Sequence, residues 1–234
     1  MPLDITFDFR TDVIGDRDPD AFSPTLQRYH QLLWSKLLPS GDPFDLTPNL
    51  RPPYTLVHDS RLGRFELSSD TVLPSFADRA ALQAIIGQMP SAAVAELSTL
   101  RYTIGGMMMW PCVMIDGNQT INQARGWNAL IADRFDLTVE CIRRHYAGDT
   151  THPLADTFGL YSAFFDLFGS FAGYVEFWLL EDLVELDGTV RLFLPSDGFT
   201  LRAVPKTLAD YTTFCERTVE FVKARNRRIQ RLAS

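Results

Sequence analysis

The feature that most constrains the fold is the charge-free run at residues 102–115, YTIGGMMMWPCVMI. Gly105 and Gly106 permit a bulge or a close approach between backbones. Pro111 restricts the run to an edge strand, an irregular strand or two short strands. Asp116-Gly117 predicts a turn directly after it. Many polar residues follow, so residues 102–146 are the best place for a polar site on a rigid scaffold.

Helix signals outnumber strand signals along the rest of the chain. Ser23-Pro24 is typical of a helix start, with serine as the N-cap and proline at the first helical position. Thr207 with Asp210 approximates a capping box, and this last helix should continue to about Leu232. Other helices are expected at 25–38, 76–89, 91–100, 121–134, 137–146, 153–169 and 173–184. Asp136 is the expected N-cap of the helix at 137–146. Strands are expected at 3–9, 54–58, 64–70 and 189–195.

This pattern predicts an α+β fold, with short antiparallel strands and hairpins packed with about seven helices and a long C-terminal helix. The 234 residues fit one globular domain, 1–234, and an N-terminal lobe at 1–75 is the alternative. A content of 46% hydrophobic residues with 17 Phe supplies a sizeable core. The aromatic residues of 158–184 are expected to be packing residues of that core.

Charge and hydropathy exclude two classes of protein. The net charge of −7 argues against a protein whose whole surface coats nucleic acid or an anionic membrane. The most apolar segment, 158–184, is interrupted by Asp166, Glu176 and Glu181, so it lacks the run of about 18 apolar residues that a membrane span needs. The acidic N-terminus has no apolar signal region. We expect no membrane partner.

The cysteines and histidines predict no metal site. Three cysteines without metal or redox spacing are interpreted as free thiols in a reducing cytosol, which predicts a cytoplasmic protein. The four histidines are scattered, with no HxH, HxxxH or CxxC motif. GxSxG, P-loop and GxGxxG motifs are also missing, so the cofactor is unknown and the sequence does not decide whether the chain is an enzyme.

Asn118, Asn122 and Arg125 form the first candidate site. They lie at a turn and at the start of a predicted helix, where exposed backbone N–H groups and a guanidinium suit an anion or a phosphate group. The alternative is that the asparagines cap the turn and Arg125 pairs with a surface carboxylate. Gly126, inside the same predicted helix, costs about 1 kcal/mol relative to alanine and indicates close packing or close ligand approach.

Arg144 and His145 extend this candidate site. Glu140 precedes Arg144 by four residues, so an ordinary helix ion pair explains that arginine. His145 shares a partly apolar helix face with Cys141, which is typical of a core histidine. The alternative is a general acid or base, because small environmental changes move an imidazole pKa across neutrality. His145 is therefore the candidate catalytic residue, and Arg144 a candidate ligand-binding residue.

The C-terminal helix carries a second candidate surface. Its basic residues could contact nucleic acid or an acidic partner. The alternative is a solvated helix end, since cations near a helix C-terminus are favoured by the helix dipole. The residues concerned are Lys223, Arg225, Arg227 and Arg228, with Arg231 beyond them.

Several phrases of the chain resemble a family of uncharacterised bacterial proteins of about this length. The resemblance rests on SPTLQRYHQLLWSKLLPSG, FELSSD, TIGG, IDGNQTINQARG, DRFDLTVECIRRHY, GYVEFWLLEDLV and VEFVKARNRRI. It spans nearly the whole chain, which implies one integral unit of bacterial cytosolic origin. The family has no assigned activity, so the resemblance assigns no catalytic residue.

Three hypotheses for the function follow. The preferred one is a protein that binds or acts on a nucleotide or another phosphate-bearing small molecule at Asn118, Asn122 and Arg125. The second is a module that binds nucleic acid or an acidic partner through the C-terminal helix. The third is a non-enzymatic oligomeric or regulatory protein, whose oligomeric state the sequence does not give.

Overall fold

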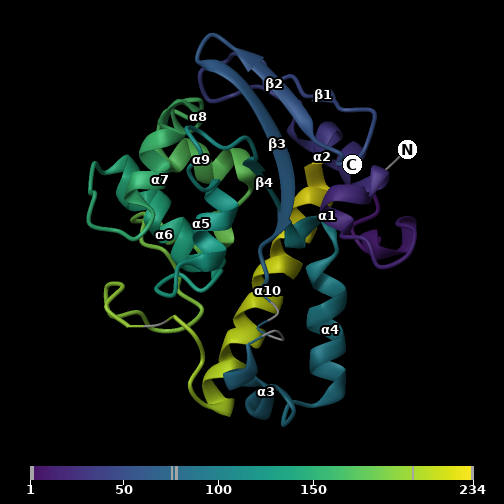
Figure 1. Ribbon diagram of the computed structural model, residues 1–234, viewed down its shortest axis with the longest axis vertical. Coiled ribbons are helices and arrows are strands. Elements are labelled where there is room, and N and C mark those ends of the chain that lie inside the picture. Colours follow the sequence, from purple (N-terminus) through teal and green to yellow (C-terminus); the bar gives the residue numbers. More distant parts are fainter. Residues whose placement is uncertain (1–2, 75, 77–78, 202, 233–234) are drawn as a thin grey trace.

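The computed structural model describes residues 3–74, 76, 79–201 and 203–232 and confirms the α+β fold (Figure 1). Its described residues form a four-stranded antiparallel sheet in the order β1 (Thr47–Pro48), β2 (Leu56–Ser60), β3 (Gly63–Thr71) and β4 (Met107–Pro111). The register pairs His58 with Phe65 and Ser69 with Met109. The predicted hairpin is confirmed as β2 and β3. β4 is an edge strand that ends at Pro111, because proline cannot donate to a ladder.

Ten α-helices lie within the described residues. In Figure 1, α5 to α9 lie to the left of β3 and β4, and α4 lies to the right, beside α10. α10 contacts α3 and α4. The helices are α1 (Pro19–Phe22), α2 (Pro24–Trp34), α3 (Ala80–Ile86), α4 (Ser91–Arg101), α5 (Ile121–Trp127), α6 (Phe135–Tyr146), α7 (Ala155–Leu160), α8 (Ser162–Asp166), α9 (Phe171–Trp178) and α10 (Leu208–Leu232), with 3-10 turns η1 (Phe9–Asp12), η2 (Ile104–Gly106) and η3 (Glu181–Leu183).

Local capping chemistry places the two best-predicted helices. Ser23 Oγ accepts the N–H of Leu26 at the start of α2. The hydroxyl of Thr207 accepts the N–H of Asp210, and the Asp210 carboxylate accepts the N–H of Thr207. Both predicted helix starts are confirmed. These signals are reliable because each involves residues no more than four positions apart.

The core contains a dense aromatic cluster between α2 and α9. Trp34 lies 4.9 Å from Trp178 between ring centroids, and Phe44 contacts Phe177 edge-to-face at 5.2 Å. Aromatic pairs in such tilted and edge-on arrangements stabilise a core beyond their burial. The prediction that the aromatics of 158–184 are packing residues is confirmed for the buried ones, which include Phe158, Phe164, Phe165, Phe168, Tyr174, Phe177 and Trp178.

The glycine pair before β4 makes the predicted close backbone approach. The N–H of Gly105 donates to Oδ1 of Asn226 on α10 at 2.8 Å. A Cβ on Gly105 would lie 2.6 Å from the same oxygen, and one on Gly106 would lie 2.5 Å from the carbonyl of Leu100. Residues with a side chain therefore do not fit at either position.

Two predicted strands are wrong because side chains capture their backbone N–H groups. In residues 3–9, the Asp4 carboxylate accepts the N–H of Thr6 at 2.9 Å, and the segment forms no strand. In residues 189–195, the N–H of Phe193 donates to the buried Asp136 carboxylate at 2.8 Å. That segment makes a single bridge, between Val184 and Val190.

The predicted helix 121–134 is also wrong in its second half. α5 ends at Trp127, and Asn128 Oδ1 then accepts the N–H of Leu130 at 2.9 Å. Such a side-chain bond competes with helix continuation. Ala132 and Asp133 have positive φ angles of 52° and 65°, which no α-helix contains.

Other helix boundaries shift for local reasons. The helix predicted at 153–169 is divided into α7 and α8 at Tyr161, and that at 173–184 ends at Trp178 because Leu179 is left-handed with φ 57°. α3 is shorter than the predicted 76–89, of which residues 77 and 78 lie outside the described residues. Within the described parts of the chain, no helix is both long and apolar enough to cross a bilayer.

Candidate functional site

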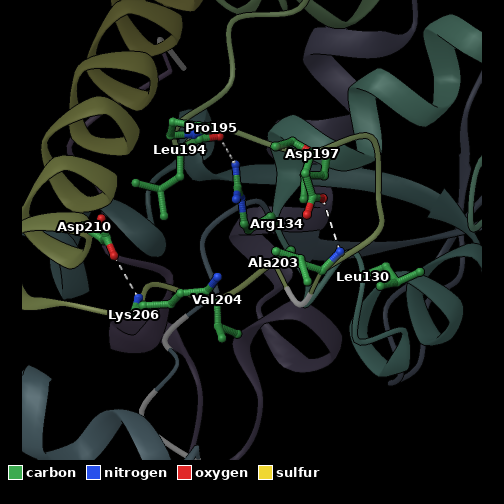
Figure 2. A pocket seen from close by; sticks show the side chains of 12 residues that line it. Leu130, Arg134, Leu194, Pro195, Asp197, Ala203, Val204, Lys206 and Asp210 are labelled. Atoms are coloured by element: carbon green, nitrogen blue, oxygen red, sulfur yellow. Dashed lines mark hydrogen bonds between the residues drawn. The ribbon is translucent and has the colours of Figure 1, made fainter.

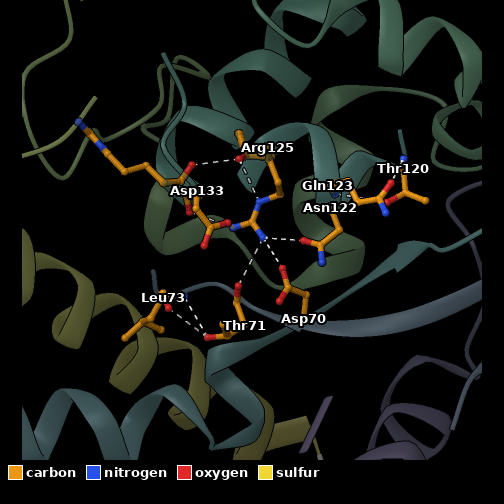
Figure 3. Close-up of polar contacts among 10 residues, drawn as sticks. Asp70, Thr71, Leu73, Thr120, Asn122, Gln123, Arg125 and Asp133 are labelled. Atoms are coloured by element: carbon orange, nitrogen blue, oxygen red, sulfur yellow. Dashed lines mark hydrogen bonds and ion pairs between the residues drawn. The ribbon is translucent and has the colours of Figure 1, made fainter. Parts of the chain in front are cut away.

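Arg125 is the centre of a polar cluster, but it is completely buried (Figure 3). Its Nη1 lies 2.6 Å from Oδ2 of Asp70, and its Nη2 lies 3.2 Å from Oδ1 of Asp133. The guanidinium therefore joins the end of β3 to the loop after α5. Its remaining acceptors are Asn122 Oδ1 at 3.1 Å, the Asp133 carbonyl at 3.1 Å, Thr138 Oγ1 at 3.4 Å and the Thr71 carbonyl at 3.5 Å.

This saturation decides what Arg125 can bind. A guanidinium has five N–H donors, and here all three nitrogens already have acceptors. A phosphate would have to displace Asp70 or Asp133 to reach it. The structure brings Arg125 and Asn122 together as predicted, whereas Asn118 lies in the surface turn, where its side chain donates to the carbonyl of Ile115.

Arg144 and His145 lie on the last turn of α6, and neither belongs to the polar cluster around Arg125 described above. Arg144 pairs with Glu140 at 2.9 Å and stacks over Phe199 at 5.0 Å. The His145 ring lies 4.9 Å from that of Phe165. Burial lowers the pKa of His145, which favours the neutral imidazole at neutral pH. These contacts are typical of a core histidine, which was the alternative to a catalytic role for His145.

The basic residues of α10 do not share one face. Arg225 is completely buried, and it donates to the carbonyls of Gly105, Met107 and Trp178 at 3.1, 2.6 and 3.1 Å. Burial lowers its pKa to about 10. At the surface, Lys223 pairs with Glu96, Arg228 pairs with Asp182 and Glu181, and Arg227 is exposed.

A cleft of about 480 Å³ lies at the junction of α1, the segment before it and the end of β3. Asp20 reaches it from α1, and Asp70 reaches it from β3. Each of the two residues affects the pKa of the other. Asp70 is the same residue that pairs with Arg125, so the cleft and the buried Arg125 cluster share a wall. Other lining residues include Arg10, Arg17, Arg101 and Tyr102.

The two carboxyl groups have unusual proton affinities. Burial raises the pKa of Asp20 well above its ordinary value, and the adjacent charges of Asp70 and Asp18 raise it further. Burial also raises the pKa of Asp70 to about 6, although the Arg125 guanidinium lowers it. Two neighbouring carboxyl groups cannot both ionise freely, and the raised pKa of Asp20 favours its protonated form.

Both signs of charge line this cleft. Among the described residues its lining contains the arginines Arg10, Arg17 and Arg101 and the aspartates Asp16, Asp18, Asp20 and Asp70. The guanidinium carbons of Arg10 and Arg101 lie 4.8 and 5.4 Å from the centre of the Tyr102 ring. Arg10 also pairs with Asp8. The Nε–H of Arg101 has no hydrogen-bond partner among the described residues, but it is buried and is not accessible from the cleft.

Comparison with known proteins gives one match. Residues 3–229 match a family described as "Family of unknown function (DUF6994)". The chain belongs to this family. The match spans nearly the whole chain and confirms the predicted membership of an uncharacterised family. No curated protein and no solved structure matches the chain.

Sequence patterns did not single out the Asp20–Asp70 pair. Asp20 belongs to the acidic segment GDRDPDAF, whose proline and glycine content predicts a turn. Asp70 ends a predicted strand, where an aspartate is typical of turn capping. The two residues are 50 positions apart, and only the packing of α1 against β3 brings them together. The one local signal was an acidic residue in the first turn after Asp18-Pro19.

Another polar cavity, of about 320 Å³, lies between α6 and the segment before α10 (Figure 2). Arg134 forms part of its wall and donates to the carbonyl of Leu194 at 2.9 Å. Arg134 also pairs with Asp136, which lies inside α6, so the prediction of Asp136 as an N-cap is wrong. The Asp136 carboxylate is occupied instead by Arg134 and the N–H of Phe193.

The described residues contain no group of three or more His, Cys, Asp or Glu that could hold a metal ion. The Asp20–Asp70 cleft remains the strongest candidate site. It combines a cavity, two neighbouring carboxyl groups with raised pKa values and arginines in the lining. Strongly shifted titratable groups in a cleft are typical of functional sites.

Proposed function

We propose that this protein is an enzyme that carries out acid–base chemistry on a small phosphate-bearing molecule in the Asp20–Asp70 cleft. The observation that carries the proposal is that Asp20 and Asp70, two carboxyl groups with raised pKa values, line one cavity of about 480 Å³. A neighbouring acid and base with separated pKa values can deliver one proton and remove another in the same reaction.

The environments of the two carboxyl groups assign their roles. Asp70 is the base, because its pKa of about 6 leaves it largely ionised at neutral pH and still able to accept a proton. Asp20 is the acid, because its raised pKa keeps it protonated. Arg125 is a positioning residue, which holds the Asp70 carboxylate at 2.6 Å and offsets its charge.

The arginines of the cleft support an anionic ligand. Guanidinium groups match the oxygens of a phosphate group and can bind them in pairs. Arg101 lines the cleft, whereas the donors of Arg125 are occupied inside the protein. The ligand class proposed from the sequence is retained, and the binding role passes from Arg125 to Arg101, Arg10 and Arg17.

The test compares wild type with Asp20→Asn on a panel of nucleotides, sugar phosphates and aryl phosphates, with product formation followed by phosphorus NMR. Asparagine keeps the size of Asp20 and removes its acidic proton, so turnover is expected to fall by about 10²–10⁴-fold. The matched control is Asp187→Asn, in an exposed turn where asparagine also accepts the N–H of Thr189. Equal turnover by Asp20→Asn and wild type would overturn the proposed acid.

The nucleic-acid alternative has less support from the geometry. Arg225 is buried against three carbonyls, and the charges of Lys223 and Arg228 are paired with carboxylates. Arg227 and Arg231 are exposed, but two cations give little affinity for a polyanion. Binding that weakens steeply with added salt and disappears on reversing the charge of Arg227 would restore this alternative.

The proposal includes a bacterial, cytoplasmic setting. All three cysteines lie in the described part of the chain and are free thiols, which supports a reducing compartment. Burial raises the pKa of Cys112 and of Cys215 to about 11, so both thiols stay protonated and unreactive at neutral pH. Secretion of the protein in disulfide-bonded form would contradict this setting.

A further inference from the structure

A second cavity, of about 290 Å³, adjoins the Asp20–Asp70 cleft. Arg10, Arg101 and Tyr102 line both spaces. The Tyr102 ring lies within 5.4 Å of both guanidinium carbons, so an aromatic face and two cations form the shared wall. A ligand that contacts this wall can extend into either space.

The second cavity differs in chemistry from the first. On α4, Val94, Leu97 and Arg101 follow the i, i+3, i+7 spacing of one helix face. α4 lies beside α10 (Figure 1). The charged residues that line it are the two arginines of the shared wall. Its apolar lining is formed by Leu73, Pro74, Ile86, Val94, Leu97 and Tyr211.

We propose that the molecule bound in the cleft carries an apolar group, an aromatic ring or a short alkyl chain, that occupies this second cavity while its phosphate group lies against Arg10 and Arg101. This inference rests on the proposed function and names the substrate class more narrowly. It excludes inorganic phosphate and fully polar sugar phosphates as preferred ligands. The two spaces then bind the two ends of one amphipathic molecule.

The position of the two spaces and the exposure of the apolar lining support this occupant. Arg10, Arg101 and Tyr102 line both spaces, so the two spaces are neighbours. Val94 remains 37% exposed although it belongs to an apolar lining, and covering it would remove apolar surface from water. Arg17 lines the cleft and not the second cavity, so the cleft has one more cation than the second cavity.

Phenyl phosphate and inorganic phosphate are suitable probes, because they differ by one aromatic ring. Isothermal titration of wild type is expected to show phenyl phosphate binding about 10-fold more tightly or better, from burial of the ring. Val94→Gln should remove most of this advantage and leave the affinity for inorganic phosphate unchanged. The matched control, Val113→Gln, changes a valine that is 54% exposed and lines neither space, and it should keep the full advantage.

The outcomes separate this inference from the proposed function. Equal affinities for the two probes, or an advantage that survives Val94→Gln, overturn the apolar subsite and leave the acid–base pair standing. Failure of both probes to bind overturns the subsite and also the phosphate part of the proposed function. Asp20→Asn is expected to bind phenyl phosphate as wild type does, because its loss concerns proton transfer. Unchanged turnover in Asp20→Asn would overturn the proposed acid without affecting the subsite.

Discussion

Nη1 of Arg125 lies 2.6 Å from Oδ2 of Asp70, and this contact ties a carboxyl group of the candidate cleft to a buried cation on α5. Asp70 is 18% exposed at its side chain, whereas Arg125 is not exposed at all. Arg125 therefore has a structural role, whereas the partly exposed Asp70 carboxyl group can react with a molecule in the cleft.

Replacing Arg125 should destabilise the fold strongly. In Arg125→Leu, Asp70 and Asp133 lose their shared cation, and breaking a buried pair from one side costs about 3–5 kcal/mol. Urea denaturation measures this loss. Arg64→Leu is the control, because its ion pair with Asp59 is mostly exposed and contributes about 1 kcal/mol or less. Similar losses in the two variants would contradict the role of Arg125.

The Asp20–Asp70 pair should make stability depend on pH. A carboxyl group whose pKa is raised in the folded state contributes stability below its unfolded value, near 4, and that contribution is lost as pH rises through the folded value, about 6 for Asp70. The raised pKa of Asp20 extends the loss to higher pH. An asparagine side chain cannot ionise, so Asp20→Asn should gain stability relative to wild type between pH 5 and pH 8.

The measurement for this pair is the difference in unfolding free energy between the two proteins at each pH, at constant ionic strength. The difference is needed because buried histidines act in the opposite direction. Burial lowers the pKa of His30 to about 3 and that of His152 to about 4, so their contribution is lost as pH falls. A constant difference across pH 5 to 8 would rule out a raised pKa at Asp20.

His152→Phe should be tolerated, unlike His30→Phe. Both ring nitrogens of buried His152 lack a partner among the described residues, so phenylalanine removes an unsatisfied group. The variant should match wild type within about 1 kcal/mol at pH 7 and exceed it at pH 5, because the unfolded histidine takes up a proton near pH 6.5.

His30 is the matched control for this test. Its ring contacts Ser69 Oγ and the indole N–H of Trp34, each at 3.0 Å, and phenylalanine would leave both groups unpaired. We expect a loss of about 1–3 kcal/mol from His30→Phe in thermal unfolding. A loss of that size from His152→Phe would show that its ring nitrogens have partners.

Gly126→Ala should stabilise the protein. Gly126 lies within α5 with an ordinary negative φ, and no described heavy atom comes within 4 Å of an added Cβ, so the close packing inferred from the sequence is wrong. Alanine should add about 0.5–1 kcal/mol to the free energy of unfolding. Gly105→Ala, where the Cβ meets Asn226, should destabilise by more than this gain. A loss at Gly126 would indicate an additional contact on this face of α5.

The sequence predicted those elements whose signals are local. The cap at Ser23, the capping box at Thr207 and the β2–β3 hairpin depend on neighbouring residues, and they are present. The predictions that are wrong concern segments whose side chains bond to partners that sequence spacing does not reveal. Asp136 accepts a backbone N–H from 57 positions away, and this contact replaces both a predicted cap and a predicted strand.

The candidate site was less predictable for the same reason. Arg125 looks like a surface residue because it follows polar neighbours at helical spacing. Its burial depends on Asp70, 55 positions earlier in the chain. Burial and pKa depend on such tertiary contacts, so neither the fully occupied donors of Arg125 nor the raised pKa values of Asp20 and Asp70 can be derived from sequence spacing.

The buried contacts of Arg225 have a consequence for synthesis of the chain. Its guanidinium donates hydrogen bonds to the carbonyls of Gly105, Met107 and Trp178. The ribosome adds these three residues 120, 118 and 47 positions before it adds Arg225. Until α10 has emerged, the rings of Phe76, Phe135 and Phe193 also lack the Phe214 and Phe221 rings of α10 that contact them. Nascent chains halted before residue 208 should therefore expose this apolar surface and depend on chaperones that bind such surfaces.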